Sequence, residues 1–191
     1  EEMYWKYGYD RYFDSFEHYY SLYQRRNLDL WAEYADGKVT KEELNRQRYL
    51  YPLEAVGAGD STLAKAYERD ALTMIPTKSK LMPHAREVLE YLSGKYNLYI
   101  LSNGFKELQS HKMRSSGIDE YFKKVVLSDD IGILKPWPEI FHFALSTTQS
   151  ELNNSLMIGD SWENDIVGAA GVGMHQVFYN LSGRTDLPFA P

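Results

Sequence analysis

Cysteine is absent from the sequence, which excludes a disulfide framework and any zinc site built on thiolates. Long hydrophobic runs are missing as well, since no apolar stretch approaches the ~20 residues that a membrane span requires. No signal-peptide pattern is visible. A reducing compartment is compatible with these absences, which predict a cytoplasmic protein without a membrane partner.

An excess of positive charge is also lacking. The chain of 191 residues carries 21 Lys and Arg against 27 Asp and Glu, a net charge of -6. This balance argues against a nucleic-acid-binding surface, and a phosphorylated substrate would require positive charge gathered locally. The length suffices for one sizeable core with a smaller attached unit, and both a monomer and a homodimer are compatible with it.

Residues 1–75 show a helical pattern rich in tyrosine, and nothing in them resembles a strand. Two capping boxes are typical of helix starts. They predict two helices, the first from Asp14 and Glu17 to Ala35 and the second from Thr40 and Glu43 toward Tyr51. Because proline disfavours helical geometry in the residue before it, Pro52 is expected to end the second helix. With a third helix from about residue 60, the segment is predicted to be a small bundle with an aromatic core.

After a hinge with Pro, Lys and Thr at residues 75–83, strands and helices alternate. Expected strands cover residues 97–101, 124–127, 155–158 and 174–179, and expected helices cover residues 84–92, 105–115 and 138–147. Such alternation implies parallel strands joined by right-handed crossovers. We therefore predict an α/β domain over residues 77–191 that follows a helical domain over residues 1–76.

Ser102, Asn103 and Gly104 follow the first expected strand at the point where a helix begins. The Ser102 hydroxyl and the amides of the next two residues can point together at an anion, a geometry that binds phosphate. Taken alone, an ordinary turn is the favoured interpretation, because these residue types make turns frequently.

Lys135 lies in a loop that two prolines, Pro136 and Pro138, stiffen. Pro136 favours extended geometry at Lys135, so the ammonium group is presented by a rigid segment. Most lysines are merely solvated, and in isolation that interpretation is favoured here as well.

The run from Leu156 to Ala170 predicts a strand, an acidic turn and a helix. Asp160 follows Gly159 at the expected end of the strand, and Asp165 comes five residues later on the first turns of the helix. Two carboxylates that converge in this way form a reasonable half-site for Mg²⁺, which takes few protein carboxylates and keeps several waters. The alternative is that both merely cap and solvate a helix N-terminus.

Together the three segments resemble motifs two, three and four of the haloacid dehalogenase (HAD) superfamily, and the similarity covers roughly residues 82–179. The resemblance implies a Rossmann-like parallel sheet core flanked by helices, with residues 1–76 as the helical-bundle cap. It also implies a Mg²⁺-dependent phosphatase that works through an aspartyl-phosphate. The implied roles are phosphoryl binding by Ser102, Asn103 and Gly104, charge stabilisation by Lys135, and metal binding by Asp160 with support from Asp165.

The first motif of the superfamily, an Asp-x-Asp-x-Thr-like segment after an apolar strand, does not occur in the sequence. In the family it precedes the cap, so it is expected before Glu1. The branch that the sequence resembles most is that of the pyrimidine nucleotidase-like phosphatases, which favours a nucleoside monophosphate as substrate. Sugar phosphates and pyrophosphate are alternatives. A dehalogenase ranks low because Asp160 is present, and a non-catalytic phosphate-binding module is the alternative of another class.

Overall fold

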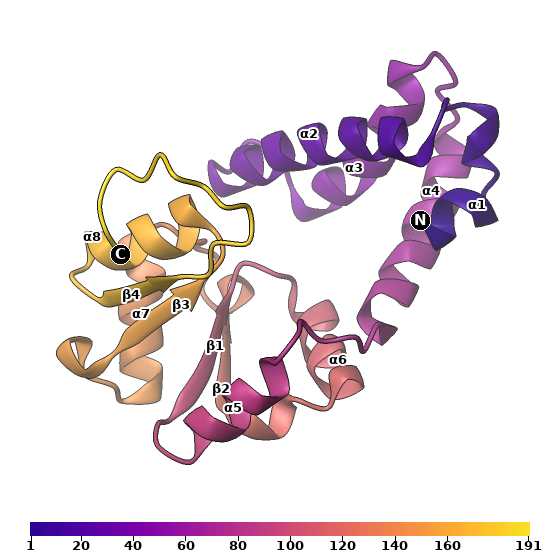
Figure 1. Cartoon of the computed structure of the whole chain (residues 1–191). Helices are drawn as coiled ribbons and strands as arrows, with labels where there is room; N and C mark the ends of the chain where they lie inside the picture. Colours follow the sequence, from indigo (N-terminus) through magenta and orange to yellow (C-terminus); the bar gives the residue numbers. More distant parts are fainter. The chain divides into compact units, whose positions relative to one another are not determined.

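The computed structural model describes residues 1–191 and divides into two compact units, Glu1–Lys78 and Ser79–Pro191 (Figure 1). The first unit is entirely helical. Its α-helices are α1 (Glu2–Lys6), α2 (Phe16–Ala35), α3 (Lys41–Ala55) and α4 (Ser61–Met74), and short 3-10 helices cover Tyr9–Arg11 and Ile75–Thr77. None of these helices, nor any in the second unit, has the length and apolar composition needed to cross a membrane.

Side chains cap the three longer helices of this unit. Thr40 accepts the N–H of Glu43 at 3.1 Å, as predicted, and Asp60 accepts the N–H of Leu63 at 2.9 Å. For α2 the predicted cap, Asp14, is wrong. Ser15 takes that place and accepts the N–H of His18 at 3.1 Å. Ser15 satisfies the amide of His18, one residue beyond the Glu17 amide that the predicted capping box would satisfy, so the start of α2 shifts by one residue.

Pro52 does not end α3, contrary to the prediction, because the helix continues to Ala55. A proline inside a helix removes one hydrogen bond and costs about 3 kcal/mol. Here Pro52 and its neighbour Leu53 are fully buried in the core of the unit. Burial of a large apolar side chain contributes about 1.5–3 kcal/mol, so the packing of this last turn is sufficient to offset the loss.

The core of the helical unit is built from aromatic rings, as predicted. The rings of Tyr9 and Tyr67 stack with their centroids 4.8 Å apart, and Tyr19 meets Tyr9 edge-on at 5.2 Å. Each such pair contributes about 0.5–1.5 kcal/mol beyond the area that it buries. Burial raises the pKa of Tyr9, Tyr19 and Tyr49, and raises the pKa of Tyr67 to about 12.

These buried hydroxyls predict alkaline unfolding of the helical unit. The pKa of each of these tyrosines is higher in the folded state than in the unfolded state. Its contribution to stability is therefore complete below the ordinary tyrosine pKa of about 10 and is lost as the pH rises toward the folded-state pKa. Each pKa unit corresponds to about 1.4 kcal/mol for each tyrosine. We expect tyrosinate absorbance and loss of helical circular dichroism to rise together in one cooperative step above pH 10. Gradual ionisation with intact helices would contradict this expectation.

The second unit alternates strands and helices as predicted (Figure 1). Its strands are β1 (Leu98–Ser102), β2 (Phe122–Leu127), β3 (Leu156–Gly159) and β4 (His175–Phe178). Its α-helices are α5 (Ala85–Ser93), α6 (Lys106–Ser116), α7 (Pro138–Thr148) and α8 (Gly168–Gly171). Short 3-10 helices cover Asp119–Tyr121, Ser128–Asp130 and Leu152–Asn154, and a π-helix, Trp162–Val167, precedes α8.

The four strands form two parallel pairs, β1 with β2 and β3 with β4. One apolar cluster joins the pairs, because Ile140 and Phe141 of α7 are fully buried against a group that includes Leu101 of β1 and Met157 of β3. The other edge of β1 and the other edge of β3 have no strand partner. The predicted α/β core is therefore present as two parallel strand pairs over one shared core, with no strand paired to the free edges of β1 and β3.

Candidate active site

Ser102 is the last residue of β1, so its side chain lies at the carboxyl end of the strand. Its Oγ accepts two hydrogen bonds, from the N–H of Gly104 and from Nε2 of Gln109 on α6, each at 3.0 Å. The Gly104 amide, predicted as a phosphate donor, is thus already used within the loop. The sequence did not indicate a role for Gln109, because a glutamine at the fourth position of a helix carries no distinctive signal.

The side chain of Asn103 connects the β1 end to the loop of Lys135. Its Nδ2 donates to the Lys135 carbonyl at 2.9 Å, and its Oδ1 accepts the Lys135 N–H at 2.8 Å. This reciprocal pair fixes the backbone of a residue 32 positions further along the chain. The Asn103 side chain therefore positions Lys135 and is not directed at a ligand.

Lys135 is only 8% exposed, which is rare for a lysine. Its Nζ donates to the carbonyl of Leu101 at 2.9 Å and to Oδ1 of Asp165 at 2.5 Å. The ammonium group is therefore held beside the last residues of β1 in a fixed orientation. The solvated-lysine interpretation does not apply here.

Asp165 is buried, and both of its oxygens are engaged. Oδ1 pairs with Lys135, and Oδ2 accepts the N–H of Ser161 at 3.0 Å. The residue lies within the π-helix, whose wider turn is found frequently at functional sites. Gly159 makes room for it, since a Cβ at that position would lie 2.3 Å from Oδ2 of Asp165. The structure thus gives Asp165 a partner, Lys135, other than the predicted metal.

Asp160 follows Gly159, the last residue of β3, and is exposed. A short series of contacts links it to the other predicted residues. Its neighbour Ser161 donates to Asp165, Asp165 binds Lys135, and Lys135 binds the carbonyl next to Ser102. Ser102, Lys135 and Asp160 are therefore brought together at the carboxyl ends of β1 and β3, where α/β proteins bind ligands.

The fit of these residues to a magnesium ion rests on Asp160. Mg²⁺ takes one or two protein carboxylates together with waters and phosphate oxygens. Asp160 supplies one exposed carboxylate, whereas Asp165 is occupied by an ammonium group. No group of three or more His, Asp or Glu side chains that could hold a metal occurs in the chain. The donor set fits a magnesium ion with one direct protein ligand from these residues.

Two other acidic side chains accept hydrogen bonds from backbone amides. Asp129 accepts the N–H of Lys106 at 3.1 Å, and Asp130 accepts the N–H of Leu127 at 2.9 Å. These bonds tie the end of β2 to the start of α6. The pair is thus part of the local turn structure.

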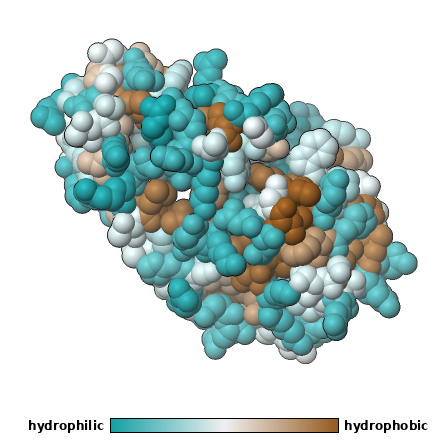
Figure 2. Space-filling view, turned by 180° about the vertical axis from the view of Figure 1, so that it is seen from behind, coloured by the Kyte–Doolittle hydropathy of each residue, from teal (hydrophilic) through white to brown (hydrophobic).

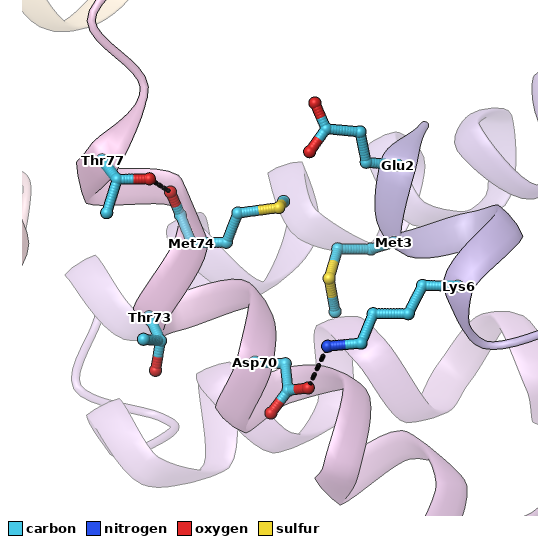
Figure 3. Close-up of a pocket in the computed structure, with 7 residues that line it drawn as sticks. All are labelled: Glu2, Met3, Lys6, Asp70, Thr73, Met74 and Thr77. Carbon is cyan, nitrogen blue, oxygen red and sulfur yellow. Dashed lines mark hydrogen bonds and ion pairs between the residues drawn. The ribbon is translucent and has the colours of Figure 1, made fainter.

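A pocket of about 630 Å³ lies in the helical unit, between α1 and α4 (Figure 3). The side chains of Met3 and Met74 face each other across it, and Lys6 pairs with Asp70 at 2.6 Å. The hydrogen bond from Lys6 holds the pKa of Asp70 well below its usual range. Because the charges in this pocket neutralise each other, it offers no site for a phosphate and contains none of the predicted site residues.

The sequence profile of the haloacid dehalogenase-like hydrolases matches residues 4–173. The match includes most of the helical unit and every site residue described above. The chain therefore belongs to the haloacid dehalogenase-like hydrolase family, a class of enzymes.

Several individual members of this family are similar to the chain over different lengths. The pyrimidine 5'-nucleotidase YjjG of Escherichia coli (strain K12) is 30% identical over 163 residues, which cover 85% of this chain and 71% of YjjG. A glyceraldehyde 3-phosphate phosphatase of Pyrococcus abyssi is 38% identical over 99 residues, 51% of this chain and 42% of that enzyme. The magnesium-bound crystal structure of the HAD-hydrolase YfnB from Bacillus subtilis superposes with a TM-score of 0.85 at 24% identity, over 95% of this chain and 81% of YfnB. This last similarity shows the fold.

Proposed function

We propose that this protein is a magnesium-dependent phosphatase of a small phosphorylated metabolite, with a nucleoside monophosphate as the favoured substrate. The observation that carries the proposal is the buried ammonium group of Lys135, held 2.9 Å from the Leu101 carbonyl beside Ser102. A fixed cation at the carboxyl end of a parallel strand, hydrogen-bonded to the residue before Ser102, suits the charge that develops on a phosphoryl group during transfer.

In this proposal each residue has a separate task. The Ser102 hydroxyl donates to a phosphoryl oxygen, and Lys135 stabilises the negative charge of the transition state. Asp160 is the carboxylate that would hold Mg²⁺, which when bound supplies Lewis-acid neutralisation of the phosphate. Asp165 and the Asn103 side chain keep Lys135 in place.

The nucleophile is proposed to come from a strand that precedes Glu1 and lies between β1 and β3. Parallel sheets are usually covered on both faces, and an isolated pair of strands is marginally stable. Here both strands have an open edge, while Leu156 and Ile158 of β3 are 53% and 52% exposed. Figure 2 shows hydrophobic side chains at the surface among hydrophilic ones. A strand in this position would bring an aspartate at its carboxyl end next to Lys135.

The proposed substrate class is supported by the relatives that match most of this chain. The match to the pyrimidine 5'-nucleotidase YjjG covers 85% of this chain, whereas the match to the glyceraldehyde 3-phosphate phosphatase covers 51%. A second pyrimidine 5'-nucleotidase, PynA of Streptococcus pneumoniae, also matches over 85% of the chain. Two nucleotidases among the relatives that match most of the chain favour a nucleotide, while a phosphoserine phosphatase of Thermus thermophilus (85% of the chain) and a ribulose-1,5-bisphosphate 5-phosphatase of Halopiger xanaduensis (74%) are the alternatives that a substrate screen must include.

Hydrolysis by the full-length protein tests this proposal. We expect an aryl phosphate to be hydrolysed with Mg²⁺, activity to be lost on chelation, and activity to return when Mg²⁺ is restored. Among nucleoside monophosphates, sugar phosphates and pyrophosphate, the nucleotides should give the highest kcat/KM. Phosphate binding without turnover would contradict the proposal and favour a non-catalytic module, and a preference for sugar phosphates would refute the substrate class alone.

A further inference from the structure

The hydroxyl group of Ser102 has its two acceptor positions filled. The N–H of Gly104 and Nε2 of Gln109 both donate to Oγ, each at 3.0 Å. A serine hydroxyl offers one hydrogen as donor and two lone pairs as acceptors. With both lone pairs occupied by protein donors, the hydrogen is the one part of the group left for a ligand.

The local chain is shaped to admit Gln109. A Cβ on Gly104 would lie 2.0 Å from Nε2 and 2.8 Å from Cδ of Gln109, a separation that real atoms do not tolerate. Glycine at this position therefore allows the glutamine side chain to reach Oγ. Phe105, the N-cap of α6, is only 3% exposed and anchors the start of the helix next to the loop.

We propose that Gln109 is a positioning residue that keeps the Ser102 hydroxyl oriented as a hydrogen-bond donor. A hydroxyl held in this state favours a ligand with unprotonated acceptor oxygens, such as a phosphoryl dianion. A ligand that must donate at this position is disfavoured, because no acceptor remains for it. The identification of the ligand as a phosphoryl group rests on the proposed function; the orientation of the hydroxyl rests on the two hydrogen bonds.

Two substitutions of similar volume separate this role from simple packing. Gln109→Met fills the space without a donor. Gln109→Glu replaces the donor with an acceptor, so the Ser102 hydrogen would turn toward the carboxylate and away from the ligand. If Gln109 only fills space, the two variants should behave alike.

The test measures kcat and KM for an aryl phosphate, and the inhibition constant of inorganic phosphate, in the full-length protein. We expect kcat/KM to fall about 10-fold for Gln109→Met and about 100-fold for Gln109→Glu, with parallel weakening of inorganic phosphate binding. In a Ser102→Ala background neither substitution should have a further effect, because the group that Gln109 orients is gone. Ser110→Ala, on the next residue of α6, serves as the matched control.

Equal losses in Gln109→Met and Gln109→Glu, or losses that add to that of Ser102→Ala, would overturn the inference. If Gln109→Glu does not fold, an unchanged kcat/KM in Gln109→Met overturns it equally. Failure of the proposed function is recognised separately, because the unsubstituted protein would then neither hydrolyse the ester nor bind inorganic phosphate.

Discussion

Replacement of Lys135 by methionine is expected to lower phosphate-ester hydrolysis by at least about 10²–10³-fold, the scale seen when one preorganised group that stabilises transition-state charge is removed. It should also destabilise the second unit, Ser79–Pro191. The Lys135–Asp165 pair is buried, with side chains 10% and 6% exposed, and the substitution leaves the carboxylate of Asp165 without its cation. Removal of one partner from a buried ion pair lowers the free energy of unfolding by about 3–5 kcal/mol.

The double variant Lys135→Met with Asp165→Asn separates the two effects. With both charges gone, no uncompensated ion remains in the interior, so much of the lost unfolding free energy should return. Activity should not return, since the ammonium group is still absent. Denaturant unfolding and aryl phosphate turnover, measured on the unsubstituted protein, the single variants Lys135→Met and Asp165→Asn, and the double variant, give the comparison. Recovery of activity together with stability would show that Lys135 acts only through the fold.

The positions of Ser102 and Asp160 were accessible from the sequence because they depend on strand ends, whereas Lys135 lies in the loop between β2 and α7. A short apolar run predicts a strand, and parallel strands deliver their last residues to one edge of a sheet. The prediction therefore needed neither side-chain orientations nor exact helix boundaries. It holds even though β1 begins and ends one residue later than expected.

What the sequence could not supply was which polar groups bind each other. Asp165 was predicted to face the metal from an α-helix, whereas the chain forms a π-helix there and the carboxylate pairs with Lys135. That partner is 30 positions away in the chain, and only the packing of loops brings the two together. Gln109 was missed for a different reason, since a glutamine inside a helix carries no distinctive signal. The place of Pro52 in α3 is decided by burial rather than by local propensity.

Asp160→Asn is expected to lower activity while leaving the fold intact, whereas Lys135→Met should lower both activity and stability. Asp160 is exposed at the end of β3, and substitutions at such positions usually change stability by no more than about 0.5 kcal/mol. An amide keeps the size of the side chain but loses the charge that a hard cation requires. We therefore expect turnover with saturating Mg²⁺ to fall about 10²–10³-fold, the scale of losing one preorganised electrostatic contribution.

Metal binding itself provides a readout that does not depend on turnover. A ligand that binds only the folded state raises stability by about 2.7 kcal/mol at a concentration 100 times its Kd, so Mg²⁺ should raise the Tm of the unsubstituted full-length protein. The increase should disappear in Asp160→Asn and persist in Asp119→Asn, an exposed aspartate that precedes β2 at the amino end of that strand. An equal Mg²⁺-dependent increase in all three proteins would place the ion elsewhere, and Asp160 would then have no part in holding it.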